Sequence, residues 1–206
     1  MALKESVIEH FSTRQFFDNT FDIMSVKVLP GEYYATKDDV MITTLLGSCV
    51  SVCLYDNTAK VGGMNHFLLP DGGDANDLLS SAGRYGVYAM ELLINHLIKL
   101  GARREHFKAK VFGGGSVIKG MTTHNIGKKN VDFIQSYLQN EGISVESSDL
   151  LDIYPRRVNF FPSTGRVMMK KLRQHHDTEA INCELRYRKA ISSVGKDNDS
   201  GDVDLF

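Results

Sequence analysis

Cys49 and His66 are the residues of this chain whose types and spacing could do covalent chemistry. The cysteine follows a Gly-Ser dipeptide, whose small side chains let a substrate and backbone N–H groups come close to the sulfur. The histidine lies 17 residues further on (66 − 49), and an imidazole beside a thiol favours the thiolate, which is the nucleophilic form. A third polar group would orient the ring, and either Thr43 or Thr44 could supply it. The pattern predicts a thiol nucleophile with a histidine base if the fold brings them together.

The segment around these residues has the pattern of a β-hairpin. In residues 50–55, Val and Leu at the even positions alternate with Ser, Cys and Tyr at the odd positions, which predicts a strand. Residues 56–57 form an Asp-Asn turn signal, and residues 61–69 look like the returning strand. In an antiparallel hairpin, the start of the first strand lies opposite the end of the second. The hairpin is therefore expected to place Cys49 and His66 near each other.

The other elements predict an α+β fold. Amphipathic patterns predict helices at about 83–100 and 127–140, and residues 180–191 could form a third. Apolar and β-branched runs predict strands at 25–29, 32–36, 40–46, 107–112, 143–151 and 157–161, with a hairpin over 161–172. Because strands and helices do not alternate one for one, a doubly wound parallel sheet is not expected.

The chain is expected to hold one domain with extensions at both ends. Residues 1–24 are predicted to be an N-terminal arm that packs onto the domain in places, and residues 25–172 are the domain itself. Residues 173–194 form a C-terminal extension that includes the possible third helix. Residues 195–206 are acidic and polar, which predicts a disordered tail.

Composition excludes several classes of protein. The 24 Lys and Arg nearly cancel the 25 Asp and Glu, so a general nucleic-acid binder is not expected. The longest stretch without a charge, residues 40–55, is 16 residues long, which is too short to span a bilayer. Three cysteines at irregular spacing do not form a disulfide framework and fit a reducing cytoplasm. No second Cys/His pair has zinc-finger spacing, so no metal site is predicted.

Four sequence blocks together are similar to the CheD family of chemoreceptor glutamine deamidases. They occur in the family's order, and the similarity covers about residues 26–172. Each block alone would be a weak signal, but jointly they are specific. The blocks are Gly47-Ser48-Cys49-Val50, Gly62-Gly63-Met64-Asn65-His66-Phe67-Leu68-Leu69-Pro70, Phe112-Gly113-Gly114-Gly115 and Asn125-Ile126-Gly127-Lys128-Lys129-Asn130.

The resemblance implies a catalytic triad and a fold. The family's triad is a cysteine, a histidine 17 residues later and a threonine six residues before the cysteine, which here are Cys49, His66 and Thr43. The resemblance thus selects Thr43 over Thr44. It implies a mixed β-sandwich flanked by two or three helices, similar to the catalytic domain of deamidating bacterial toxins. It implies no metal and no organic cofactor.

The implied reaction converts the side-chain amide of a protein glutamine into glutamate with release of ammonia. The implied substrates are the cytoplasmic domains of methyl-accepting chemotaxis receptors, and the implied partner is a CheC-type phosphatase. Residues expected to line the substrate groove or to hold the oxyanion are Gly47, Ser48, Gly114 and Gly115. Two alternatives stay open: a non-catalytic module that binds or regulates such a phosphatase, and a thiol hydrolase acting on a small amide.

Overall fold

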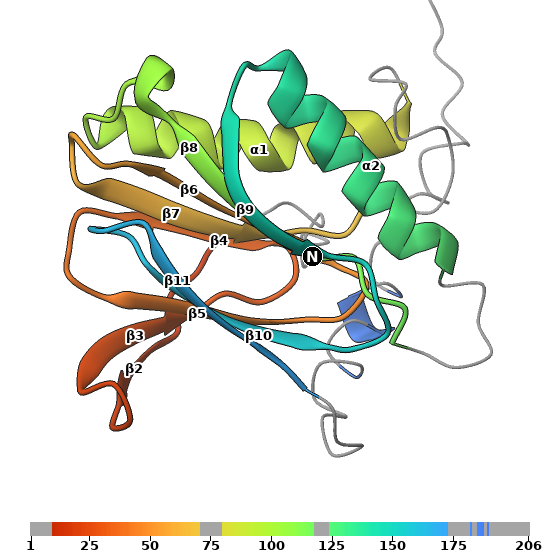
Figure 1. The fold of residues 1–206 in the computed structure, drawn as a ribbon, viewed down its shortest axis with the longest axis horizontal. Coiled ribbons are helices and arrows are strands. Elements are labelled where there is room, and N and C mark those ends of the chain that lie inside the picture. The colour runs from red at the N-terminus through yellow and green to blue at the C-terminus, as the bar shows by residue number, and fades with distance from the viewer. Residues whose placement is uncertain are drawn as a thin grey trace, which may run out of the picture.

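Two β-sheets packed face to face form the body of the protein, and two helices cover the outer face of one of them (Figure 1). The computed structural model describes residues 10–70, 80–117 and 124–172, together with residues 182, 185–187 and 189. The six-stranded sheet has the order β1-β4-β7-β6-β8-β9, with the bounds His10–Phe11, Glu32–Thr36, Val61–His66, Val50–Asp56, Lys108–Gly113 and Ser144–Leu150. The five-stranded sheet has the order β11-β10-β5-β3-β2, with the bounds Arg166–Lys171, Arg156–Phe161, Met41–Leu46, Ile23–Lys27 and Gln15–Asp18.

The helices α1 (Ser81–Lys99) and α2 (His124–Asn140) both lie on the six-stranded sheet (Figure 1). Ser80 begins α1, because its hydroxyl accepts a hydrogen bond from the amide of Gly83 at 2.9 Å. A short 3₁₀-helix, Arg104–His106, precedes β8. Within the described part of the chain, no helix is both long and apolar enough to cross a membrane.

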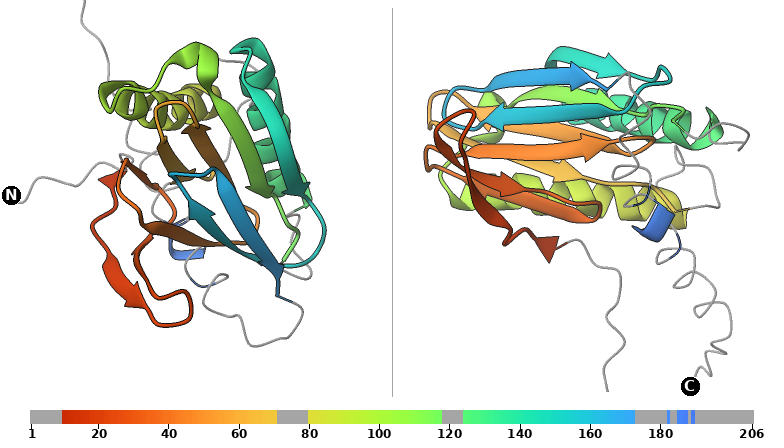
Figure 2. Two further views of the ribbon diagram at one scale, coloured as in Figure 1. Left: turned by 60° about the vertical axis from the view of Figure 1, so that its left-hand side comes forward. Right: turned by 90° about the horizontal axis from the view of Figure 1, so that it is seen from below.

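The central strands of the six-stranded sheet are buried on both faces, whereas its edge strand β9 is largely exposed and the five-stranded sheet is buried on one face. One apolar cluster fills the space between the six-stranded sheet and the helices, and a second cluster fills the space between the two sheets. All seven residues of β6 are buried for this reason. The outer face of the five-stranded sheet has neither α1 nor α2 over it, because both helices lie on the far side of the sandwich (Figure 2).

The α+β prediction is confirmed, and the predicted hairpin is the antiparallel pair β6–β7. The predicted strand over 61–69 is shorter than expected: it ends at His66, and only a single bridge from Phe67 to Val50 follows. Both long helices begin slightly earlier than their patterns indicate.

The predicted N-terminal arm and C-terminal extension are each described only in part. From His10 onward, the segment predicted to be an arm contributes a strand to each sheet, since β1 pairs with β4 and β2 pairs with β3. The five described residues of the predicted C-terminal extension have helical backbone. The predicted acidic tail, residues 195–206, lies outside the described residues.

Candidate active site

Cys49 lies where the chain passes from one sheet to the other. β5 belongs to the five-stranded sheet and ends at Leu46, and β6 belongs to the six-stranded sheet and begins at Val50. The three residues between them, Gly47, Ser48 and Cys49, are all buried, and Cys49 is 1% exposed. The thiol is therefore carried by a short connection that both sheets anchor.

The glycines that follow β8 hold this connection in place. The amide of Gly114 donates to the carbonyl of Cys49 at 2.8 Å, and the amide of Gly115 donates to the carbonyl of Gly47 at 2.8 Å. Gly113 has a φ of 119°, and a Cβ there would lie 2.1 Å from the carbonyl oxygen of Cys49. Only glycine can bring the backbone this close.

These hydrogen bonds bear on the oxyanion role predicted for two of the glycines. Gly114 and Gly115 were expected to hold an oxyanion or to line the substrate groove, but their N–H groups already donate to the Gly47–Cys49 connection. A backbone N–H has one hydrogen, so these two amides are already used in holding the Gly47–Cys49 connection, whereas the predicted groove-lining role stays a prediction. The two other predicted residues, Gly47 and Ser48, belong to the connection itself.

Asn130 of α2 fastens the same connection from the helix side. Its Nδ2 donates to the carbonyl of Ser48 at 2.9 Å, and its Oδ1 accepts from the amide of Leu69 at 2.9 Å. The side chain is fully buried, so both bonds form away from water. Asn130 thus links the residue before Cys49 to the segment that follows His66. The sequence pattern placed Asn130 in a family motif, but its two partners could only be found from the folded arrangement.

His66 lies at the end of β7, on the same face of the sheet as Cys49. Val50 and Phe67 exchange two backbone hydrogen bonds of 3.0 Å, which sets Ser51 opposite His66. Since side chains alternate along a strand, Cys49 shares the face of Ser51 and is a diagonal neighbour of His66. That face points into the space between the sheets, where Cys49 packs in the inner cluster.

The ring of His66 is oriented by Thr44, which comes from the opposite sheet. The hydroxyl of Thr44 donates to the carbonyl of Val28 at 2.7 Å, which uses its only hydrogen. The contact of 2.8 Å between Thr44 Oγ1 and His66 Nδ1 must then be a hydrogen bond donated by the ring. Nδ1 therefore carries the proton, and Nε2 has a lone pair.

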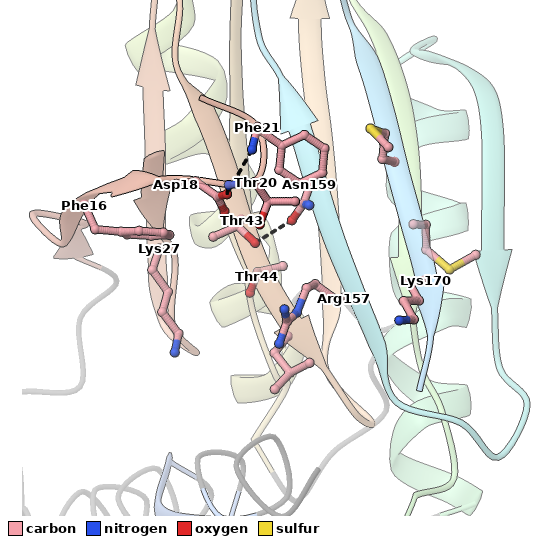
Figure 3. Close-up of a pocket in the computed structure, with 13 residues that line it drawn as sticks. Phe16, Asp18, Thr20, Phe21, Lys27, Thr43, Thr44, Arg157, Asn159 and Lys170 are labelled. Atoms are coloured by element: carbon pink, nitrogen blue, oxygen red, sulfur yellow. Dashed lines mark hydrogen bonds between the residues drawn. The ribbon is translucent and has the colours of Figure 1, made fainter. Parts of the chain in front are cut away.

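The threonine that touches the ring is not the one that the resemblance selects. Ile42, Thr44 and Leu46 are buried between the sheets, whereas Thr43 points to the outer face of β5. There the hydroxyl of Thr43 donates to Asn159 Oδ1 at 2.7 Å (Figure 3). The two-residue period of the strand puts Thr43 and Thr44 on opposite faces, and packing against the six-stranded sheet makes Thr44 the inward one. Thr43, six residues before Cys49, therefore lies on the outer face of β5, away from His66.

The environment keeps the imidazole neutral. Burial lowers the pKa of His66 from its ordinary 6.5 to about 3, and the nearby carbonyl of Val28 acts in the opposite sense. Nε2 is buried and has no hydrogen-bond partner within the described part of the chain, and the same holds for Ser51 Oγ on the facing strand. The ring is therefore a proton acceptor whose acceptor nitrogen is not already engaged.

This burial has a measurable effect on stability. A histidine that is neutral in the fold and ionises near pH 6.5 when unfolded lowers the free energy of unfolding as the pH falls from 6.5 towards 3. We expect the unfolding free energy of the wild type to fall between pH 6 and 4 by about 1 kcal/mol per pH unit more than that of His66→Gln. Urea denaturation over this range measures the difference, and parallel curves for the two proteins would show that the ring is solvated.

Two further features concern metal binding and the surface of the neighbouring strand. Among the described residues, no group of three or more His, Cys, Asp or Glu side chains is placed to bind a metal ion. On the other face of β5 lies an open groove of about 530 Å³, whose lining includes Thr43, Leu45, Arg157 and Asn159 (Figure 3).

Comparison with known proteins identifies the family. Residues 68–171 match the family described as CheD chemotactic sensory transduction. A probable chemoreceptor glutamine deamidase CheD from Methylobacillus flagellatus is 52% identical over 96% of this chain and 97% of the relative. Another from Janthinobacterium sp. (strain Marseille) is 49% identical over 99% of this chain and 100% of the relative.

Among solved structures, the hypothetical protein YfiH of Bacillus licheniformis aligns with a TM-score of 0.36 at 14% identity, over 72% of this chain and 66% of that chain. The family match and the relatives, which are about half identical over nearly their whole length, establish the kinship. The chain belongs to the CheD family.

Proposed function

We propose that this protein is a protein-glutamine deamidase that converts specific glutamines of chemotaxis receptors to glutamate and releases ammonia. The observation that carries the proposal is the Thr44–His66 hydrogen bond, which leaves Nε2 as the base on the face of the sheet that also carries Cys49. The names of the relatives support the substrate class. The catalytic set is Cys49, His66 and Thr44, with Thr44 in the role that the resemblance assigns to Thr43.

The first half of the reaction forms a thioester. Nε2 of His66 takes the thiol proton of Cys49 as the sulfur attacks the amide carbon of the glutamine. The ring then carries a positive charge only while a negative charge develops beside it, which suits a buried imidazole that is neutral at rest. The protonated ring gives its proton to the leaving nitrogen, and ammonia departs.

The second half consumes water. His66, neutral again, takes a proton from a water molecule that attacks the thioester carbon, and the C–S bond breaks to give glutamate and the free thiol. Thr44 holds the ring throughout, because its hydroxyl accepts a hydrogen bond from Nδ1–H and donates one to the carbonyl of Val28.

The oxyanion formed in both steps needs hydrogen-bond donors. We assign this role to backbone amides of the Gly47–Cys49 connection, which precedes β6. Their position beside the sulfur supports the assignment, and each such donor typically contributes about 3–4 kcal/mol to the transition state.

The proposal includes the cellular setting that the resemblance implies. It places the protein in the cytoplasm with a CheC-type phosphatase as a partner, and it relates the sandwich to the catalytic domain of deamidating toxins. A module that only binds a phosphatase is the second candidate, but binding alone has no physical need for a thiol beside an oriented base.

The proposal is tested on a receptor cytoplasmic fragment. Incubation with the protein should convert specific glutamines to glutamate, read by peptide mass spectrometry, with ammonia released in equal amount. Added hydroxylamine competes with water for a thioester, so the same positions should yield glutamyl hydroxamate. If the fragment is recovered unchanged, the enzyme proposal fails. If glutamate forms but no hydroxamate ever does, the thioester route fails.

A further inference from the structure

We propose that the groove on the outer face of the five-stranded sheet is the docking surface for an acidic, partly apolar segment of the receptor substrate. The inference rests on the proposed function, because it names how the same reaction holds its protein substrate. The groove is lined by residues of β2, β3, β5, β10 and β11 and by the β2–β3 turn. Neither α1 nor α2 covers this face (Figure 2).

The strand register arranges the groove in rows. Across the sheet, Lys27, Thr43 and Asn159 stand at one level, and the next level on the same face holds Leu45, Arg157 and Lys170. Three cations therefore lie beside the part of β5 that runs from Thr43 to Leu45. Asp18 is the acidic residue of the lining, and its carboxylate accepts hydrogen bonds from the amides of Thr20 and Phe21 at 2.8 and 3.2 Å (Figure 3).

Two of these cations are not neutralised within the fold. Neither the guanidinium of Arg157 nor the ammonium of Lys170 has an ion-pair or hydrogen-bond partner among the described residues, and both side chains are exposed. Lys171, the next residue, behaves differently: its ammonium pairs with Asp149 and Asp152 at 3.2 and 2.9 Å. The positive charge of the groove is thus directed outward, to whatever binds there.

Apolar side chains adjoin the cations. Met168 is 43% exposed and Phe16 is 40% exposed, and both line the groove. A surface that combines exposed apolar side chains with unpaired cations fits an amphipathic partner of negative charge. It does not fit a small neutral amide, which would need an enclosed pocket.

The chemistry of the reaction explains why the partner would be acidic. Each turnover replaces a neutral carboxamide with a carboxylate, so a substrate segment with several target glutamines becomes more negative as it is modified. Cations beside the site attract such a segment and steer its approach.

The groove leads towards the nucleophile. Leu45 lines it and lies four residues before Cys49 (49 − 45), and β5 ends at Leu46. A segment bound along the outer face of β5 can therefore present a glutamine at the end of the sandwich where the Gly47–Cys49 connection lies.

The experiment reverses the charge of the groove. We expect Arg157→Glu combined with Lys170→Glu to raise the KM for a receptor cytoplasmic fragment about tenfold or more, with kcat little changed. The wild-type KM should rise with salt, and this salt dependence should be lost in the double variant. The matched control is Lys60→Glu combined with Lys99→Glu, which makes the same change in net charge on the β6–β7 turn and at the end of α1.

A second measurement separates docking from chemistry. Binding of the receptor fragment to Cys49→Ala is measured with and without the groove reversals, so that turnover plays no part. Weaker binding with the reversals, and not with the control pair, supports the proposal. If the wild type converts glutamine but the reversals change neither KM nor binding, the groove is not the docking surface, while the proposed function stands. If the wild type converts nothing, the proposed function itself has failed.

Other occupants of the groove give different results. Should the reversals change the oligomeric state, measured by light scattering, the groove binds a second copy of the chain. Should their effect on KM vanish when residues 195–206 are removed, the groove binds the chain's own acidic terminus. Either result overturns the proposal.

Discussion

Cys49→Ala is expected to abolish deamidation, with kcat falling by about four orders of magnitude or more. Without the sulfur no thioester forms, and His66 has no thiol proton to accept. The fold should survive, because the change removes one sulfur from a connection that Gly114, Gly115 and Asn130 still hold by hydrogen bonds. A single-turnover assay on the receptor fragment, with thermal unfolding measured in parallel, gives both numbers.

The matched control is Cys53→Ala. Cys53 is a second buried cysteine, lies in β6, and points to the same face of the sheet as Cys49. Burial raises the pKa of its thiol far above the ordinary value, so it has no nucleophilic form at neutral pH. We expect kcat to stay within about threefold of the wild type. Equal losses in the two variants would mean that packing, and not sulfur chemistry, explains the effect.

Thr44→Val is expected to lower kcat about 100-fold or more while leaving KM nearly unchanged. Valine has the shape of threonine but no hydroxyl, so Nδ1 loses its acceptor and the carbonyl of Val28 loses its donor. The ring can then carry its proton on Nε2, and in that tautomer Nε2 cannot accept the thiol proton of Cys49. Nitrogen NMR of the imidazole should show the change of tautomer directly.

Two variants make this result specific to the hydroxyl. Thr44→Ser keeps the oxygen and should restore most of kcat, which a purely structural role would not require. Thr43→Val removes a hydroxyl that bonds only Asn159 on the outer face, so kcat should be nearly unaffected. If Thr43→Val is the variant that loses activity, the spacing of the family triad holds and the orientation described above is wrong.

The sequence predicts most of the fold because its patterns are local. The alternation in β6, the Asp-Asn turn after it and the stripe of α1 depend only on neighbouring residues, and each element was found within a few positions of its predicted range. The hairpin argument that predicts Cys49 near His66 is of the same kind, and the register of β6 and β7 puts the two residues on one face.

What the sequence could not predict depends on contacts between distant segments. The choice between Thr43 and Thr44 is made by the sheet that faces His66, which is built from strands more than 100 residues apart. The use of the Gly114 and Gly115 amides depends on where β8 ends relative to β5. Spacing along the chain carries no information on either point.

The three groups of the proposed catalytic set come from different parts of the sandwich, so the chain cannot be divided without separating them. Thr44 comes from the five-stranded sheet, His66 from the six-stranded sheet, and Cys49 from the link between them. Since β4 and β5 belong to different layers, as do β9 and β10, no continuous fragment of the chain contains one complete layer without strands of the other. A change that separates the two layers should therefore remove activity and cooperative unfolding together. Turnover can then be used to measure the fraction of molecules in which the two layers are packed.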